Sequence, residues 1–119
     1  MKKYIFSLIF LLLVGVIWLA SSLSLIVVEN KTGAMVEGVK ISQLGIPIWS
    51  GQIKEDDSVL IYLLEHKMYG VDLTFFFGGE QKEFNMIGYM VPGDVFDGYH
   101  VIKIKSHGSL EYGFEFYWN

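Results

Sequence analysis

A long run without charge at the start of the chain limits what this sequence can fold into more than any other feature. Lys2 and Lys3 are followed by Tyr4–Val28, in which no residue is charged. As a helix rising about 1.5 Å per residue, this run exceeds the ~30 Å hydrocarbon core of a bilayer. Two lysines before an apolar stretch are typical of an export signal or a signal anchor. We therefore expect the lysines to stay inside and the rest of the chain to cross the membrane.

Two interpretations of this leader remain open. Leu8–Ala20 is long for a signal core and Trp18 suits an interfacial anchor, which favours an uncleaved transmembrane segment over residues 4–22. Ala20 and Ser22 also fit the small-residue pattern of a cleavage site, which would release residues 23–119. A buried core helix is a third interpretation, and the leading lysines disfavour it. Residues 1–22 are thus predicted to be a signal peptide or signal anchor.

Residues 23–119 predict a single all-β domain. They are rich in Val, Ile, Phe and Tyr, which favour strands, and they contain no cysteine, so the domain relies on its core for stability. Seven to eight short strands with frequent turns indicate an antiparallel β-sandwich, immunoglobulin-like or Greek-key, after one N-terminal hydrophobic helix. A small barrel is the alternative. The expected strands cover residues 23–29, 35–42, 45–49, 58–64, 71–77, 80–91, 99–106 and 110–118.

Local patterns predict the roles of several segments. Pro47 indicates an edge strand, because proline donates no hydrogen bond to a neighbouring strand. The continuously apolar Ser58–Leu64 predicts a central strand or one covered on both faces. Gly78-Gly79 predicts a tight hairpin, and Gly88 and Gly38 predict bulges, with an edge position as the alternative for Gly38.

Some of these features together resemble a known group of proteins. They are the hydrophobic leader, Ile26–Gly33, the Gly78-Gly79 hairpin and Gly88–Gly93. The pattern resembles small envelope proteins of Gram-negative bacteria that have no assigned function. The resemblance implies a β-sandwich and supplies no catalytic or ligand residues.

The charge balance excludes some partners. Without Lys2 and Lys3, seven lysines face thirteen acidic residues, a net charge of −6, and the chain contains no arginine. An acidic domain repels nucleic acid, and without arginine it lacks the bidentate group that grips phosphate. We therefore expect no nucleic-acid binding.

The sequence contains no pattern that predicts catalysis, a cofactor or a metal. Without cysteine and without a Gly-x-Ser-x-Gly turn, the common nucleophile motifs are missing. His66, His100 and His107 are expected to be ordinary surface residues rather than joint metal ligands. Asp94 and Asp97 in the loop before His100 could hold a cation, but we expect them to accept backbone N–H groups in turns. The chain is predicted not to be an enzyme.

Aromatic residues on strand faces expected to be exposed supply the remaining functional prediction. Trp49, Phe76 and Tyr117 form a candidate partner surface, although a second sheet or loops could cover them. The Pro47 strand or the first strand could also pair with an extended partner segment. The sequence thus predicts a non-enzymatic interaction or accessory module, held in a bacterial inner membrane by residues 4–22, with its C-terminal domain in the periplasm and a protein partner in the envelope. The alternative is a soluble periplasmic or secreted domain that binds a ligand or acts as an inhibitor.

Overall fold

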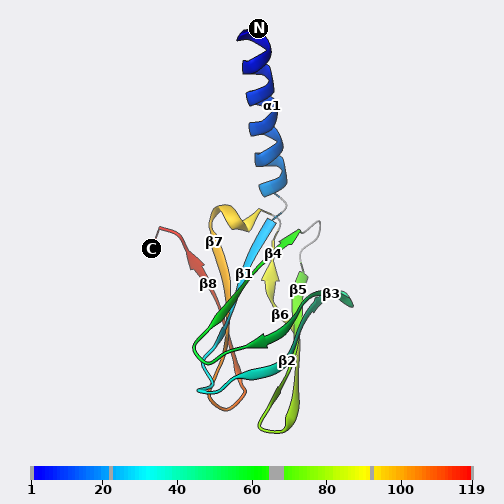
Figure 1. Ribbon diagram of the computed structural model, residues 1–119, viewed down its shortest axis with the longest axis vertical. Helices are drawn as coiled ribbons and strands as arrows, with labels where there is room; N and C mark the ends of the chain where they lie inside the picture. Colours follow the sequence, from blue (N-terminus) through cyan, green and yellow to red (C-terminus); the bar gives the residue numbers. More distant parts are fainter. Residues whose placement is uncertain (1, 22, 65–68, 92, 119) are drawn as a thin grey trace.

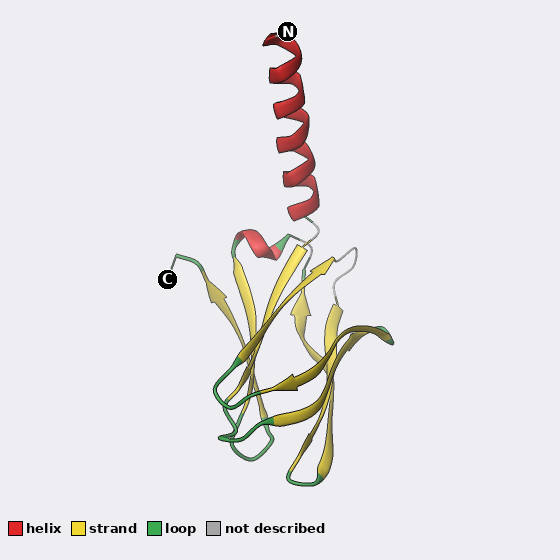
Figure 2. Cartoon of the chain, viewed as in Figure 1, coloured by secondary structure: helices red, strands yellow, loops and turns green. Residues whose placement is uncertain are grey.

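A computed structural model shows one helix standing on a two-sheet β-sandwich (Figure 1, Figure 2). It describes residues 2–21, 23–64, 69–91 and 93–118. The elements are α1 (Lys2–Ala20), β1 (Leu23–Asn30), β2 (Val36–Gln43), β3 (Ile46–Ile53), β4 (Ser58–Leu64), β5 (Tyr69–Phe77), β6 (Glu80–Met90), the short 3₁₀ helix η1 (Asp94–Phe96), β7 (Gly98–Ile104) and β8 (Leu110–Phe116). The predicted sandwich of seven to eight strands after a hydrophobic helix is confirmed.

The helix α1 projects from the domain rather than packing into it. It is long and apolar enough to cross a membrane, and none of its Lys2–Leu19 window is buried. Such a surface is stable in lipid and not in water, because apolar side chains gain by leaving water. The interpretation of residues 4–22 as a core helix is therefore wrong.

The two sheets have the strand orders β4-β1-β7-β8 and β3-β2-β5-β6. Neighbouring strands pair antiparallel, apart from β1 and β7, which run parallel from Ile26 opposite His100 to Asn30 opposite Ile104. Two residues separate α1 from β1, so the start of β1 is the helix-proximal end of that strand. The parallel register places the start of β7 at the same end. The loops beyond Asn30 and the β5–β6 hairpin lie at the opposite, helix-distal end (Figure 1).

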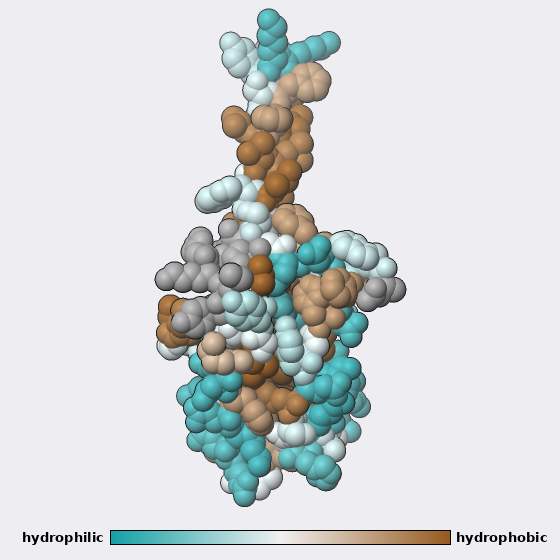
Figure 3. Space-filling model, turned by 180° about the vertical axis from the view of Figure 1, so that it is seen from behind, coloured by the Kyte–Doolittle hydropathy of each residue, from teal (hydrophilic) through white to brown (hydrophobic). Residues whose placement is uncertain are grey.

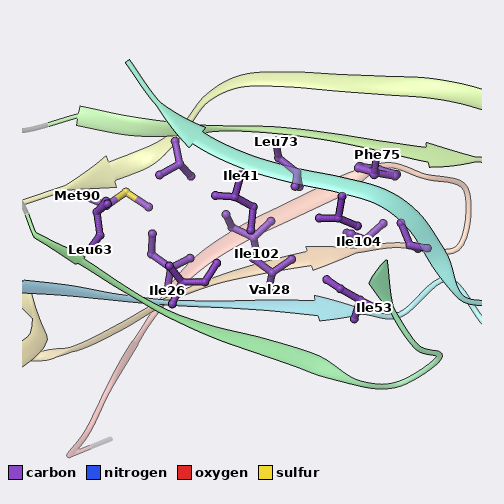
Figure 4. Packing of buried hydrophobic residues seen from close by; sticks show 14 residues of the cluster. Ile26, Val28, Ile41, Ile53, Leu63, Leu73, Phe75, Met90, Ile102 and Ile104 are labelled. Atoms are coloured by element: carbon purple, nitrogen blue, oxygen red, sulfur yellow. The ribbon is translucent and has the colours of Figure 1, made fainter. Parts of the chain in front are cut away.

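The hydrophobic core lies between the sheets and is built from alternate strand residues (Figure 4). Ile26, Ile102 and Ile104 enter it from one sheet, and Leu73 and Phe75 enter it from the other, all at most 1% exposed. Inward and outward residues alternate because successive side chains on a strand point to opposite faces.

The predicted glycine features are confirmed. Gly78 and Gly79 both have positive φ in the turn that joins Phe77 to Glu80, as a two-residue hairpin requires. The β2–β3 register shifts between Val36 and Val39, so the bulge at Gly38 turns both valines inward. This bulge interrupts the regular alternation of inward and outward side chains in the strand expected over residues 35–42.

The edges of the sheets differ in part from the prediction. Pro47 does lie on an edge strand, β3. The apolar segment Ser58–Leu64 is also an edge strand, β4, and its outer side chains Leu60 and Tyr62 are more than half exposed, so the expected central position is wrong. The first strand cannot offer an edge to a partner, because β1 lies between β4 and β7.

Candidate functional site

A buried polar network lies at the helix-proximal end of the sandwich, where β6, η1, β7 and β8 meet. His100 is the first inward-facing residue of β7, continuing the row formed by Ile104 and Ile102, and it is only 2% exposed. Its Nε2 lies 2.6 Å from Asp94 Oδ2 and its Nδ1 lies 2.6 Å from Tyr112 Oη. We call Asp94, His100 and Tyr112 the buried network.

The aromatic neighbours of His100 hold its ring in place. The ring stacks on Tyr112 with centroids 5.8 Å apart and meets the edge of Phe114 at 4.9 Å. In the β7–β8 register, Phe114 lies opposite His100 and Tyr112 lies opposite Ile102. The imidazole is thus held by hydrogen bonds at both nitrogens and by contacts of its ring with Tyr112 and Phe114.

Asp94 connects the network to the loop before β7. Its Oδ2 also accepts the backbone N–H of Val91 at 3.0 Å, which closes the turn predicted for this residue. Its Oδ1 is buried and has no hydrogen-bond partner among the described residues. The expected turn role of Asp94 is therefore confirmed, and the structure adds a histidine partner that the sequence did not suggest.

Tyr112 on β8, an edge strand of one sheet, contacts β6, an edge strand of the other sheet. Burial raises the pKa of its phenol, a backbone hydrogen bond from Tyr89 on β6 lowers it in part, and the nearby negative charge of Asp94 raises it further. With the Tyr89 N–H donating to Oη, we assign the phenolic proton to the bond with His100 Nδ1 and the ring proton to Nε2 facing Asp94. Every bond in the network then has a donor.

Gly88 makes room for this arrangement. It has φ +70°, and a Cβ there would lie 2.7 Å from Tyr112 Cζ. The β5–β6 register shifts on both sides of Val71, so the bulge predicted at Gly88 is confirmed. The bulge and the missing side chain together let the Tyr112 ring approach the β6 backbone.

A cavity of about 420 Å³, here called the proximal cavity, opens beside the buried network. Its size suits a small ligand. It is lined by Tyr89, Val91, Gly93, Asp94, Asp97, His100, Tyr112 and Phe114. On the domain face shown in Figure 3, hydrophobic side chains gather in the middle between hydrophilic flanks.

A second cavity, the distal cavity, lies at the opposite end of the sandwich and has a volume of about 540 Å³. It is lined by the loop before β2, the start of β2 and the β5–β6 hairpin, including Met35, Glu37, Phe76 and Phe77. The Phe76 ring covers Gly38, where a Cβ would lie 2.7 Å from Phe76 Cδ2. Phe76 is nevertheless 52% exposed, so part of its ring faces the cavity opening.

The three aromatic residues predicted as a partner surface lie in three different places. Phe76 lines the distal cavity, and Trp49 on the edge strand β3 is half-buried against the hydrophobic core. Tyr117 follows β8 at the helix-proximal end, with its ring 6.2 Å from that of Tyr99. The structure therefore does not bring the three together, and their role in binding stays a prediction.

Sequence reasoning missed the buried network. His100 was expected at the surface and is buried, because its place in the alternating row of β7 points it inward. His66 lies outside the described residues, and His107 is exposed in the β7–β8 hairpin as expected. Within the described ranges, no group of three or more His, Cys, Asp or Glu residues is arranged to hold a metal ion.

Comparisons with known proteins identify the fold alone. No protein family model and no curated protein matches the chain. The NMR structure of a protein from Eubacterium rectale is similar, with a TM-score of 0.54 and 16% sequence identity over 80% of this chain and 90% of that chain. At this identity the similarity concerns the fold and carries no information about activity.

Proposed function

We propose that this chain is a non-catalytic interaction module that α1 anchors in a bacterial membrane and that binds a protein partner through the distal cavity. The observation that carries the proposal is the position of Phe76. This exposed aromatic residue lines a cavity at the end of the sandwich opposite α1. A domain tethered at one end presents its other end to partners.

The anchor rests on the properties of α1. Its side chains are exposed along the helix, it carries no charge after Lys3, and it leads into β1 after two residues. The lysines at its start favour an orientation with the N-terminus in the cytoplasm. In a bacterium with two membranes, the sandwich would then lie in the periplasm against the inner membrane.

The distal cavity has the surface chemistry of a small protein-binding site. Met35 and Phe76 leave 44% and 52% of their surfaces exposed on its walls, and Glu37 adds a charge at its edge. Exposed methionine and phenylalanine beside a cavity favour an apolar anchor residue from a partner.

The geometry of the buried network supports a structural role. Both ring nitrogens of His100 are hydrogen-bonded, one to Asp94 at the start of η1 and the other to Tyr112 on β8. We therefore assign the network a structural role that fastens β8 and η1 to β7.

Site-specific crosslinking tests the partner surface. A photoreactive phenylalanine analogue at position 76 of the full-length chain, expressed in its host membrane, should capture one discrete partner. The control places the same analogue at Gln52, an exposed position on β3. Equal capture at both positions, or none at position 76, would contradict the proposal.

The proximal cavity favours a second candidate function, a soluble domain that binds a small ligand after the leader is removed. The cavity has ligand size, and aromatic rings and carboxylates line it. Under this alternative, the host would yield residues 23–119 in a soluble fraction. Native mass spectrometry of that material would show a retained small molecule, and a Phe114→Ala substitution in the cavity wall would abolish its retention.

A further inference from the structure

Several large aromatic side chains are exposed at the helix-proximal end of the sandwich. They come from β4, η1 and the end of β8, and their exposed fractions run from 47% to 68%. We call them the proximal aromatic surface: Tyr62, Phe96, Phe116, Tyr117 and Trp118. They are separate from the buried network and contribute little to the core, so the fold itself does not account for them.

Strand pairing places these residues at the level where α1 ends. Phe116 lies opposite Gly98, the first residue of β7, and the Tyr117 N–H donates to the carbonyl oxygen of Asp97 at 3.1 Å. Tyr62 lies opposite Leu25, near the start of β1. In Figure 1, η1 accordingly lies just below the helix, and the end of β8 lies farther out on the left at the same end of the sandwich.

Ring contacts connect Tyr117 with two neighbouring aromatic residues. The Tyr117 ring lies 6.3 Å from the ring of Trp118 and 6.2 Å from that of Tyr99. Partial burial raises the pKa of Tyr117, and Tyr62, Asp94 and Tyr99 raise it further through their charges.

The connection to α1 is too short to lift this surface away from the end of the helix. Two residues join α1 to β1, and two extended residues span only about 7 Å. The loop before η1 also packs against the end of α1, since a Cβ at Gly93 would lie 2.9 Å from the carbonyl oxygen of Ser21. A membrane that holds α1 must meet the proximal aromatic surface.

The charge near this surface selects the kind of lipid. Asp97 and Glu115 are exposed beside it. The described lysines of the sandwich lie midway along β2 or toward the distal end, and Lys103, for example, lies opposite Glu29 and Glu111 in the strand register. Among the residues that the structure describes, no lysine lies beside these carboxylates in the strand register, and such carboxylates repel anionic lipids. Trp and Tyr prefer the headgroup region of a bilayer.

We infer that the proximal aromatic surface docks on the headgroup layer of a zwitterionic bilayer, with Trp118 as its most exposed contact. This inference rests on the proposed anchor, because α1 brings the surface to the membrane. Docking fixes the tilt of the sandwich and points the distal cavity away from the lipid. Tyr117, predicted from the sequence to meet a protein partner, then contacts lipid instead.

The three tryptophans of the chain allow one experiment to test the anchor and the docking separately. Full-length variants that keep only Trp18, Trp49 or Trp118, with phenylalanine at the other two positions, are placed in phosphatidylcholine nanodiscs. Lipids brominated in the acyl chain quench a tryptophan within the bilayer, and lipids with a nitroxide on the headgroup quench one at its surface. Trp18 reports insertion of α1, Trp118 reports docking, and Trp49 on β3 is the matched control.

We expect acyl-chain bromine to quench Trp18 and headgroup nitroxide to quench Trp118 several-fold more than Trp49. Replacing part of the phosphatidylcholine with phosphatidylglycerol should reduce the quenching of Trp118, and added salt should restore it. If Trp18 is quenched but Trp118 behaves like Trp49, the docking surface is wrong while the anchor stands. If Trp18 is not quenched, the anchor itself is wrong. Stronger quenching of Trp118 on phosphatidylglycerol would overturn the assignment to zwitterionic lipid.

Discussion

Gly88 on β6 and Tyr112 on β8 are in close contact between the two sheets, and the tyrosine ring occupies the space that a side chain at position 88 would need. Two separate features meet at this glycine, a positive φ and a close approach of another strand. The contact connects β6 of one sheet with β8 of the other and holds Tyr112 Oη against His100.

A Gly88→Ala substitution should therefore destabilise the sandwich by about 2–4 kcal/mol, through backbone strain and overlap with the Tyr112 ring. Urea denaturation of the detergent-solubilised protein measures the change. Gly33→Ala is the control, since Gly33 has φ +88° but nothing within 4 Å of a Cβ, and it should cost about 1 kcal/mol. Equal losses in both variants would show that Tyr112 does not crowd residue 88.

Replacement of His100 tests the buried network. His100→Phe keeps a planar ring but leaves Asp94 Oδ2 and Tyr112 Oη without their imidazole partner, so we expect a loss of about 2–4 kcal/mol in the free energy of unfolding. His107→Phe, the same change at an exposed hairpin position, should stay within about 0.5 kcal/mol of the parent. A His100 variant as stable as the His107 variant would mean that the network contributes nothing to stability.

The raised pKa of Tyr112 makes a prediction about alkaline pH. A pKa that is higher in the folded state stabilises the fold fully below the unfolded value of about 10 and loses that contribution as pH rises through the folded value. The difference in unfolding free energy between the parent and Tyr112→Phe should thus be constant up to about pH 10 and shrink above it. Tyr117 also has a raised pKa, but both proteins contain it, so its contribution cancels in the difference between their unfolding free energies. A difference that grows above this pH would contradict the direction of the shift.

A comparable buried polar group lies at the distal end. Asn30 is fully buried, and its Nδ2 donates to the carbonyl oxygens of Ala34, Ile53 and Lys54 at 2.7–3.1 Å. Asn30→Asp should cost about 3 kcal/mol or more, because a carboxylate would face carbonyl oxygens in place of a donor.

Thermal denaturation at neutral pH measures the cost at Asn30, and Asn85→Asp at an exposed position on β6 is the matched control. Recovery of stability at a pH low enough to protonate the new carboxyl group would support this explanation. A harmless Asn30→Asp substitution at neutral pH would show that these loops do not depend on the amide donor.

The local parts of the fold could be predicted from the sequence, and the long-range parts could not. Strand alternation and paired glycines predicted the β5–β6 hairpin and the bulge at Gly88, because both depend on φ preferences of neighbouring residues. The edge position of Ser58–Leu64 was missed because both of its faces are apolar, so that its sequence cannot show which face is covered.

The buried network was beyond sequence reasoning for a similar reason. The alternation of β7 could have indicated that His100 points inward with Ile102 and Ile104. Its partners Asp94 and Tyr112 come from a loop and from the next strand, and only the pairing of β7 with β8 brings them to the same imidazole. The positions of Phe76 and Tyr117 at opposite ends likewise depend on strand direction and register.

The most direct test of the anchored sandwich is the mass and location of the mature protein in its native host. The account predicts the intact 13.6 kDa chain in a membrane fraction that resists alkaline extraction, with the sandwich cleaved by protease added from the outer side of that membrane. A soluble intact chain in the cytoplasm would contradict the account, and a soluble product that lacks residues 1–22 would replace the anchored module with the released ligand-binding domain.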